Sequence, residues 1–571
     1  MRNNFLRLGV LFAIVLFITS CSSKGPKEAR YIPKDASVVL AVDPGLLQEK
    51  MKKGNIDIDT LFKQMLGKDS GNAKVKKMFE DFKNCGVDWN SKFYFFVTQK
   101  TDASKGQGTF INLIGDLKDS SKLLSYLLTI DEFRGREIKN EKNYTYIQLD
   151  YNGMVAWTDK MVLVTGYHYS PGVSIMNMPD TVMKTYQAPS INKSEEIRKE
   201  VARFFTQKED ESMASVKAFT DMFKQKSDGY FLSTTNSTLN NLNKSMPLQL
   251  PKLEELLKDN YTVGTFNFAD GKVEFNYSFY PNKILDGILK KYPGSAIKTA
   301  MFESYPSDKV DMLLVTSFNP EIIGGILKQL EVEALADGFL DKMGLSTKDI
   351  YKCLKGDIAV VVSDLQWPAA ATQPGAKPQV VKMIFNAAIG DTASFAKLMD
   401  KAVENGFLYK GDNGYQSGYL MRSLGLYLHT DSKNIILASD SLTYAAYAAN
   451  TAKLKLANGV MDEMKGKNSA MFVDLGNIFN GFSNMNDNAA MNTAKATFKD
   501  VIFTSENYNG TKTSASGALR LKDEKQNSLV TLLKLIPEVS EQVRNSMPAG
   551  DSTSAGDGIL SLPIFPRLNN L

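Results

Sequence analysis

The chain alternates short apolar runs with clusters of turn-forming residues. Val38–Val42 and Phe93–Val97 have the length and the β-branched or aromatic content of buried strands. Phe266–Phe275 predicts a hairpin, because the Asp270-Gly271 pair at its centre is a dipeptide that two-residue hairpin turns prefer. Asp43-Pro44 predicts the start of a helix, since Asp-Pro begins turns and helices. The pattern therefore predicts an α+β fold of mostly antiparallel sheets with helices packed on one face.

The second half of the chain repeats the pattern of the first. Gly115-Asp116 and Gly390-Asp391 each close an apolar run and lie 275 residues apart, and Lys122-Leu123 and Lys397-Leu398 follow at the same offset. The other matched segments, in the same order, are Val38–Val42 with Met312–Val315, Phe93–Val97 with Ile358–Val362, Trp157–Asp159 with His429–Asp431, and Tyr230–Leu232 with Ala470–Val473. Matches at nearly constant spacing predict an internal duplication with two related lobes, at residues 31–300 and 301–547.

The first apolar run is of a different kind. Arg2 and Arg7 provide a basic start, Leu8–Ile18 is apolar, and Thr19-Ser20-Cys21 ends it with small residues, which is the order of a secretory signal. The run has 11 residues, whereas a membrane-spanning helix needs about 20. Residues 1–20 are therefore predicted to be a cleaved signal peptide.

The residues before the cleavage point resemble a lipobox, Ile18-Thr19-Ser20-Cys21. The resemblance implies a lipid on Cys21, with fatty acids such as palmitate, and two or three such chains hold a protein firmly in a bilayer. Ser22 follows in place of an aspartate, so we expect an outer-membrane anchor facing the periplasm. Residues 21–30 are predicted to be a flexible leader and residues 548–571 a flexible tail.

Composition narrows the class of protein further. The chain has 571 residues with 68 Lys and Arg against 63 Asp and Glu, and the signs are mixed, which does not suggest nucleic-acid binding. This length exceeds what one core can organise. Besides Cys21 only Cys85 and Cys353 occur; a disulfide between them is one alternative, and two buried free thiols are the favoured one.

Two further segments resemble a known group of proteins. The opening Tyr31–Ser37, the segment Cys85–Trp89 and the lipobox together resemble Bacteroidetes lipoproteins that are uncharacterised and classed only as a domain of unknown function. The resemblance covers nearly the whole mature chain. It implies kinship without an assigned activity, so it supplies no functional residues.

The sequence offers little support for catalysis, cofactors or metals. Only His168 and His429 are present, which excludes a multi-histidine metal site, and a packing role is favoured for both. Ser190–Lys193 fits the SxxK pattern, but its partner motifs are missing, and Ser194-Glu195-Glu196 before Ile197 indicates a helix start. No phosphate-binding glycine motif occurs.

Carboxylates are the remaining candidates for chemistry. Two of them, correctly spaced, could hydrolyse a glycosidic bond as acid and base. The candidates are Asp35, Asp43, Asp116, Asp391 and Glu274. Asp116 and Asp391 recur in both halves after a glycine, and helix capping is the favoured interpretation of both.

These observations predict a membrane-anchored envelope lipoprotein, held through lipidated Cys21, that is a non-enzymatic binding or scaffold module. Its expected partners are the membrane and an envelope protein or glycan, with no nucleic acid, cofactor or metal. The alternative is a periplasmic hydrolase that acts on glycan or peptide through a carboxylate pair. A third hypothesis is a carrier of an apolar ligand, which requires a large apolar cavity inside one lobe.

Overall fold

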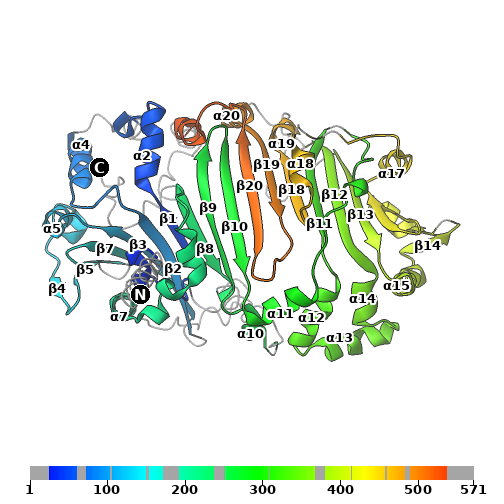
Figure 1. Ribbon diagram of the computed structural model, residues 1–571, viewed down its shortest axis with the longest axis horizontal. Coiled ribbons are helices and arrows are strands. Elements are labelled where there is room, and N and C mark those ends of the chain that lie inside the picture. The colour runs from blue at the N-terminus through cyan, green and yellow to red at the C-terminus, as the bar shows by residue number, and fades with distance from the viewer. Residues whose placement is uncertain are drawn as a thin grey trace, which may run out of the picture. The chain divides into compact units, whose positions relative to one another are not determined.

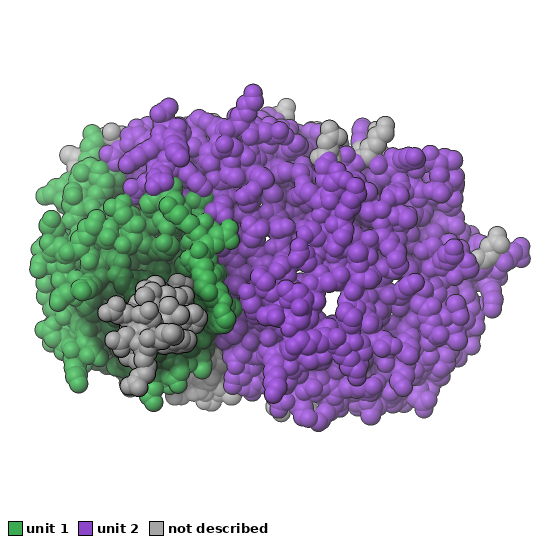
Figure 2. All heavy atoms as spheres, viewed as in Figure 1, with its two compact units in different colours: residues 1–46, 71–234, 553–571 green, residues 47–70, 235–552 purple. Residues whose placement is uncertain are grey.

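The computed structural model describes residues 25–60, 73–102, 106–149, 153–170, 192–236, 250, 252–307, 309–366, 380–412, 414–454, 456, 459–481 and 489–535. The chain forms two compact units, which are distinguished by colour in Figure 2. Unit 1 comprises residues 1–46, 71–234 and 553–571, and unit 2 comprises residues 47–70 and 235–552.

Unit 1 is built on an antiparallel sheet with the strand order β8-β1-β2-β3-β7-β6-β5-β4. Its strands are β1 (Val38–Val42), β2 (Phe93–Asp102), β3 (Gly106–Asp116), β4 (Ile138–Asn140), β5 (Thr145–Leu149), β6 (Gly153–Trp157), β7 (Met161–Ser170) and β8 (Gly229–Thr234). Its helices are η1 (Lys27–Tyr31), α4 (Ala73–Lys83), α5 (Ser120–Leu127), η3 (Asp131–Phe133), α7 (Lys193–Thr206), η5 (Glu209–Glu211), η6 (Met213–Ser215) and α8 (Lys217–Met222).

Helices contact both faces of the unit 1 sheet. The ring of Phe204 on α7 meets Phe96 of β2 edge-to-face, with centroids 5.3 Å apart. On the other face, Leu123 and Leu127 of α5 belong to a buried cluster with Val162 and Val164 of β7. The alternation of side chains along each strand places these two sets on opposite sides.

Unit 2 carries a wider antiparallel sheet with the order β9-β10-β20-β19-β18-β11-β12-β13-β17-β16-β15-β14. Its strands are β9 (Tyr261–Ala269), β10 (Lys272–Tyr280), β11 (Val310–Ser317), β12 (Leu354–Gln366), β13 (Val380–Ile389), β14 (Leu408–Gly411), β15 (Gly414–Ser417), β16 (Tyr427–Thr430), β17 (Asn434–Ala438), β18 (Ser469–Asp474), β19 (Phe498–Ser505) and β20 (Thr513–Leu521).

The helices of unit 2 gather mainly beyond the two ends of the strands, and Figure 1 shows α11 to α14 at one end and α19 and α20 at the other. They are α2 (Pro44–Lys53, in this unit from residue 47), α10 (Leu253–Leu257), α11 (Lys283–Lys291), η7 (Thr299–Met301), α12 (Glu321–Gln329), α13 (Glu333–Leu340), η8 (Asp341–Met343), α14 (Thr347–Lys352), α15 (Thr392–Glu404), α16 (Tyr419–Ser423), α17 (Ser441–Ala448), α18 (Val460–Met464), α19 (Leu475–Gly481) and α20 (Ala489–Thr497).

The main core of unit 2 lies on one face of its sheet. Leu313 of β11 and Phe472 of β18 are paired in register and buried, and they pack with Tyr447 of α17 and Val460 of α18. On the opposite face, Phe395 of α15 packs in a separate cluster at the β13–β17 end of the sheet. Antiparallel sheets with packed helices confirm the predicted α+β class.

The strand orders of the two units correspond. The unit 1 order β8-β1-β2-β3-β7-β6-β5-β4 recurs in unit 2 as β18-β11-β12-β13-β17-β16-β15-β14. Hairpins follow at equivalent places, β9–β10 and β19–β20. This correspondence is what a duplicated chain would have, and it supports the duplication, which stays a prediction.

The compact units divide the chain differently from the predicted lobes. The hairpin β9–β10 falls in the predicted lobe 31–300, yet it belongs to unit 2 because β10 pairs with β20. Its turn is as predicted: Ala269 pairs with Lys272, and Gly271 has a φ of +68°, which glycine adopts without strain. Residues 25–30, assigned by sequence to the leader, include the start of η1, where Ala29 is buried.

Candidate functional site

A polar cavity of about 500 Å³ lies in unit 1 beside η1. Its wall combines Lys27 and Glu28 of η1 with Tyr94 of β2, Asp116 at the end of β3, and Phe223. The cavity has the volume of a small-molecule site. Two carboxylates, Glu28 and Asp116, line this cavity, and Asp116 is one of the acids that the sequence offers as candidates for hydrolysis.

Glu28 and Asp116 are neighbouring acids that both lie close to the ammonium group of Lys27. Burial raises the pKa of Glu28, and the neighbouring Asp116 raises it further. Lys27 neutralises Asp116 with an Nζ–Oδ2 distance of 3.0 Å, and this hydrogen bond raises the pKa of Lys27. Burial, followed by the charge of Glu28, also raises the pKa of Tyr94. Burial therefore favours the protonated form of Glu28, and Lys27 balances the charge of Asp116.

The contacts of this pair suit a structural role. The Lys27 Nζ lies 3.6 Å from a carboxylate oxygen of Glu28 and 3.0 Å from one of Asp116, so one cation joins the two acids. This arrangement suits a clasp that fastens η1 to the end of β3. We name Lys27, Glu28 and Asp116 the η1 clasp.

A smaller cavity of about 200 Å³ lies on the other side of β2 and is apolar. Phe82, Trp89, Phe93 and Tyr126 line it together with the Cys85 side chain. This volume falls below the range of about 300–1,000 Å³ that is usual for ligand sites. Burial raises the pKa of the Cys85 thiol, so little reactive thiolate is present at neutral pH.

The largest candidate surface is the face of the unit 2 sheet opposite the main core. Residues paired directly across antiparallel strands share a face, so the register defines rows of side chains that cross the sheet. One row is apolar at every position: Phe266, Phe275, Gly517, Phe503, Met471, Leu314, Val360, Phe385 and Leu437. The next row is also apolar throughout: Phe268, Val273, Leu519, Val501, Val473, Met312, Val362 and Met383.

We call these two rows the apolar rows. Except for Val273, their side chains are half-buried or exposed, and Leu314 has an exposed fraction of 41%. The adjacent Leu313, on the core side of the same strand, is 0% exposed. The contrast between these neighbours shows that the sheet has one closed face and one face that is open over much of its width.

The dimensions of the apolar rows suit a binding surface. Nine strands at a spacing of about 4.8 Å make a row about 38 Å long. Two rows, each covering about 7 Å along the strands, give an apolar strip on the order of 500 Å². The largest apolar patch on a typical monomer is about 300–600 Å² and is often functional, so a strip of this extent is a candidate binding surface.

The structure places the predicted cysteines and histidines as follows. Cys21 lies outside the described residues. Cys85 and Cys353 are both free and buried, which confirms the favoured alternative. His429 on β16 stacks on the ring of Tyr444 at 3.7 Å between centroids, as a packing residue does. His168 lies on β7, paired with Thr109 of β3.

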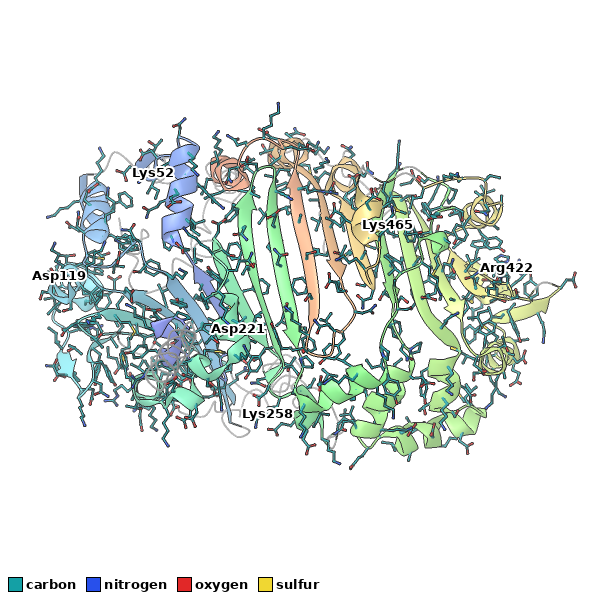
Figure 3. All side chains as sticks on the ribbon, in the orientation of Figure 1. Lys52, Asp119, Asp221, Lys258, Arg422 and Lys465 are labelled. Carbon is teal, nitrogen blue, oxygen red and sulfur yellow. The ribbon has the colours of Figure 1, made fainter. Side chains whose placement is uncertain are left out.

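The predicted capping acids have different outcomes. Asp391 caps α15 and accepts a hydrogen bond of 2.8 Å from the backbone N–H of Ser394, as predicted. Asp116 is not a cap, so that prediction is wrong. Asp119, labelled in Figure 3, caps α5 through the N–H groups of Ser121 and Lys122, and it leaves Asp116 free for the η1 clasp.

The other acids do not converge on a site. Asp35 pairs with Arg203 at 3.0 Å. Asp43 pairs with Lys92 at 2.9 Å and accepts from the N–H of Leu46 at the start of α2. Glu274 pairs with Lys272 on its own strand at 2.7 Å. All three therefore have structural partners.

Only part of the SxxK match at residues 190–193 lies within the described residues. Ser190 lies outside the described residues, whereas Lys193 is the first residue of α7. Asn192 caps this helix by accepting from the N–H of Glu195 at 3.1 Å. The predicted helix start at this place is confirmed.

Sequence reasoning missed Glu28 and the apolar rows. Glu28 lies before the first strand in a segment assigned to the leader, and nothing local marks it as buried. The run Ile358–Val362 predicts a buried strand, because Val360 and Val362 alternate with equally apolar neighbours. Such a run shows that both faces of the strand are apolar, which is the signal that could have indicated a partner surface.

The described ranges contain no candidate metal site and no candidate membrane-spanning helix. No cluster of three or more His, Cys, Asp or Glu side chains there could hold a metal ion. None of the helices in those ranges is both long and apolar enough to span a bilayer.

Comparisons with known proteins identify the family of this chain. A family model described as Domain of unknown function (DUF4836) matches residues 29–529, which confirms the predicted kind of family. No curated protein matches. The solved "Structure of crystal form I of TP0453" matches with 10% identity and a TM-score of 0.20, over 48% of this chain and 89% of that one. A score so low carries no argument about fold or function.

Proposed function

Because the chain belongs to the family described as Domain of unknown function (DUF4836), membership brings no activity, and we propose that it is a lipid-anchored binding protein of the cell envelope. Its binding surface is the open face of the unit 2 sheet, and its partner is another envelope protein with a complementary apolar surface. The single observation that carries the proposal is the pair of apolar rows. Water contact along these rows is unfavourable, and a partner would relieve it.

The shape of the surface favours a protein partner over a small apolar ligand. Carriers enclose a ligand in a cavity, whereas the apolar rows form a strip about 38 Å long. A standard protein interface buries about 800 Å² on each side, with an apolar centre and a polar rim. The apolar rows have the extent of such a centre.

The anchor is supported by the sequence of the first 21 residues. Acylation of Cys21, cleavage after residue 20 and an outer-membrane location that faces the periplasm belong to this proposal. Gly25 follows Cys21 by four residues, which span at most about 14 Å. The η1 clasp begins two residues later and would fix the point at which the tether leaves the fold.

The alternative function, hydrolysis by a carboxylate pair, has one observation in its favour. Glu28, with its raised pKa, and Asp116 line a cavity of suitable size. In that case Glu28 would be the acid and Asp116 the base. The ion pairs of Lys27 with both carboxylates favour the clasp instead. A Glu28→Gln chain that retains full hydrolytic activity on envelope glycan or peptide would exclude this role.

The test of the binding proposal uses the full chain, extracted from envelopes in mild detergent. The informative variant is Leu314→Asp, and the matched control is Asn276→Asp on the polar face of β10. We expect wild type and control to retain one envelope protein at fixed stoichiometry through purification, and Leu314→Asp to lose it. Retention by all three chains would contradict the proposal. The anchor is tested separately, since Cys21→Ser should abolish incorporation of labelled palmitate.

A further inference from the structure

A second exposed apolar surface in unit 2 differs from the apolar rows, because side chains project outward from a tight turn. We name it the Tyr419 patch. It contains Phe407, Tyr409, Tyr419, Leu420, Arg422 and Leu424. The exposed fractions are 86% for Tyr419 and 71% for Leu424, and 46% for Phe407.

The backbone of the Tyr419 patch is well fastened. The N–H of Gly418 donates to the carbonyl of Phe407 at 2.7 Å, which joins the start of α16 to the start of β14. Met421, between the exposed residues, packs into the core cluster around α15. The exposed side chains thus stand on a fixed support, and their exposure does not come from a loose loop.

The patch carries a cation that no carboxylate of the described residues pairs with. The nearby Lys410 pairs with Asp400 at 3.8 Å, whereas Arg422, labelled in Figure 3, forms no ion pair in the described part of the chain. Its guanidinium lies 5.5 Å from the ring centroid of Tyr409. After burial, its charge is the second cause that lowers the pKa of His429. A cation beside exposed Tyr and Leu side chains is the composition of a surface that binds the interface of an anionic bilayer.

The rival surface in the same unit lacks this complementarity. Leu335, Phe339 and Met343 form an exposed stripe along α13 and η8, with 65% of Phe339 exposed. Glu333, Asp337 and Asp341 flank the stripe on the same segment. Acidic neighbours are repelled by an anionic membrane, so this stripe serves as a control surface.

We infer that the Tyr419 patch is a membrane contact, in which Tyr419, Leu420 and Leu424 enter the interface of a bilayer and Arg422 binds lipid phosphate. The inference rests on the proposed anchored location and adds a second attachment point. A contact of low affinity can bind the membrane once the protein is tethered, because the tether raises the effective concentration of membrane near the patch. The patch would therefore orient the protein on its membrane.

The experiment measures co-sedimentation with vesicles of phosphatidylethanolamine and phosphatidylglycerol at 3:1. It uses the processed chain with Cys21→Ser, so that acyl chains do not contribute. We expect salt-sensitive binding, at least fivefold weaker for Leu424→Ser and for Arg422→Gln, and unchanged for the matched control Phe339→Ser. Pure phosphatidylcholine vesicles should bind at least fivefold less.

Three outcomes would overturn the inference. One is equal binding by the Leu424→Ser and Phe339→Ser chains. Another is vesicle binding that Leu314→Asp abolishes, since the apolar rows would then be the membrane contact. The third is absence of vesicle binding by the parent chain; loss of an envelope protein partner from the Leu424→Ser chain would then make the patch a protein interface. Loss of palmitate labelling, by contrast, concerns only the anchor.

Discussion

The rings of Phe275 and Phe503 lie 6.1 Å apart by their centroids, although a whole strand separates their backbones. That strand is β20, and the residue between them in register is Gly517. The ring of Phe503 occupies the place that a side chain at Gly517 would take. The absence of a side chain there lets the aromatic residues of β10 and β19 form one continuous apolar row.

Gly517→Ala should therefore destabilise unit 2. A Cβ at this position would collide with the ring of Phe503 and with the Ile502 carbonyl, so the ring must leave its position. Overpacking of this kind costs about 1–3 kcal/mol. Chemical denaturation measures the loss.

Gly287→Ala provides the control for this substitution. Gly287 lies within α11, and a Cβ there would meet nothing within 4 Å. Alanine is the better helix former, so unchanged or slightly raised stability is expected. Equal destabilisation by the two variants would refute the packing argument at Gly517.

Leu313 and Leu314 are neighbours on β11 that face opposite sides of the sheet, so their truncations should differ. Leu313→Ala removes a side chain that is 0% exposed in the main core and should cost about 2–5 kcal/mol. Leu314→Ala, at 41% exposure, should cost less than about 1 kcal/mol. Urea denaturation of the two variants measures the difference in the free energy of unfolding, and similar losses would show that the face bearing Leu314 is covered.

Asp311 should make unit 2 less stable as the pH rises towards neutrality. Burial raises the pKa of Asp311 to about 6, and the nearby Asp364 and Asp474 contribute to the shift. The folded pKa exceeds that of the unfolded chain. Its stabilising contribution is thus complete below pH of about 4 and is lost as the pH passes through about 6.

Asp311→Asn removes this titration and keeps an acceptor for the N–H of Leu365, which donates to Asp311 at 2.7 Å. A shift of about two pKa units corresponds to about 3 kcal/mol at most. Between pH 4 and pH 7, the variant should gain up to that amount relative to wild type in the free energy of unfolding. If the free energy of unfolding changes with pH in the same way for both chains, the raised pKa does not belong to Asp311.

Glu200 is expected to stabilise unit 1 through its two cationic partners. Its side chain is 0% exposed, 2.5 Å from Arg203 and 2.6 Å from Lys100, and Thr98 donates a further hydrogen bond of 2.9 Å. Burial alone would raise the pKa of Glu200, but Arg203 and Lys100 outweigh burial and hold it below its ordinary value.

Glu200→Gln should cost about 1.5–3 kcal/mol, because the charged hydrogen bonds to Glu200 are lost while Lys100 and Arg203 remain partly solvated. The contribution of Glu200 in the wild type is present above its unfolded pKa and is lost as the pH falls through the folded one. Thermal unfolding at pH 7 and pH 3 checks both statements. Glu195→Gln, on the exposed side of α7, should leave the midpoint unchanged; a similar fall would indicate a general effect of charge on this helix.

Local chemistry made much of the fold predictable. The Asp270-Gly271 hairpin and the Asp391 cap depend on residues within a few positions of each other, and both were predicted from sequence. The same argument failed at Asp116 because a second acid, Asp119, follows three residues later and takes the capping role. Two local candidates for one role cannot be ranked without the position of the helix.

The candidate surface could not be predicted for a different reason. Alternating apolar residues on β12, such as Val360 and Val361, indicate two apolar faces but not whether both are covered. Coverage depends on where α15, α17 and α18 pack, which is set by contacts between distant segments. Glu28 is a similar case, since its neighbour Asp116 lies far along the chain, at the end of β3.

The central claim, that the open face of the unit 2 sheet binds an envelope protein, is tested most directly by photocrosslinking in intact cells. A photoreactive phenylalanine analogue is placed at Leu314 or, as the control, at Asn276 on the opposite face. The account predicts one discrete protein adduct from position 314 and none from position 276. Absence of an adduct at 314, or the same adducts from both positions, would contradict it.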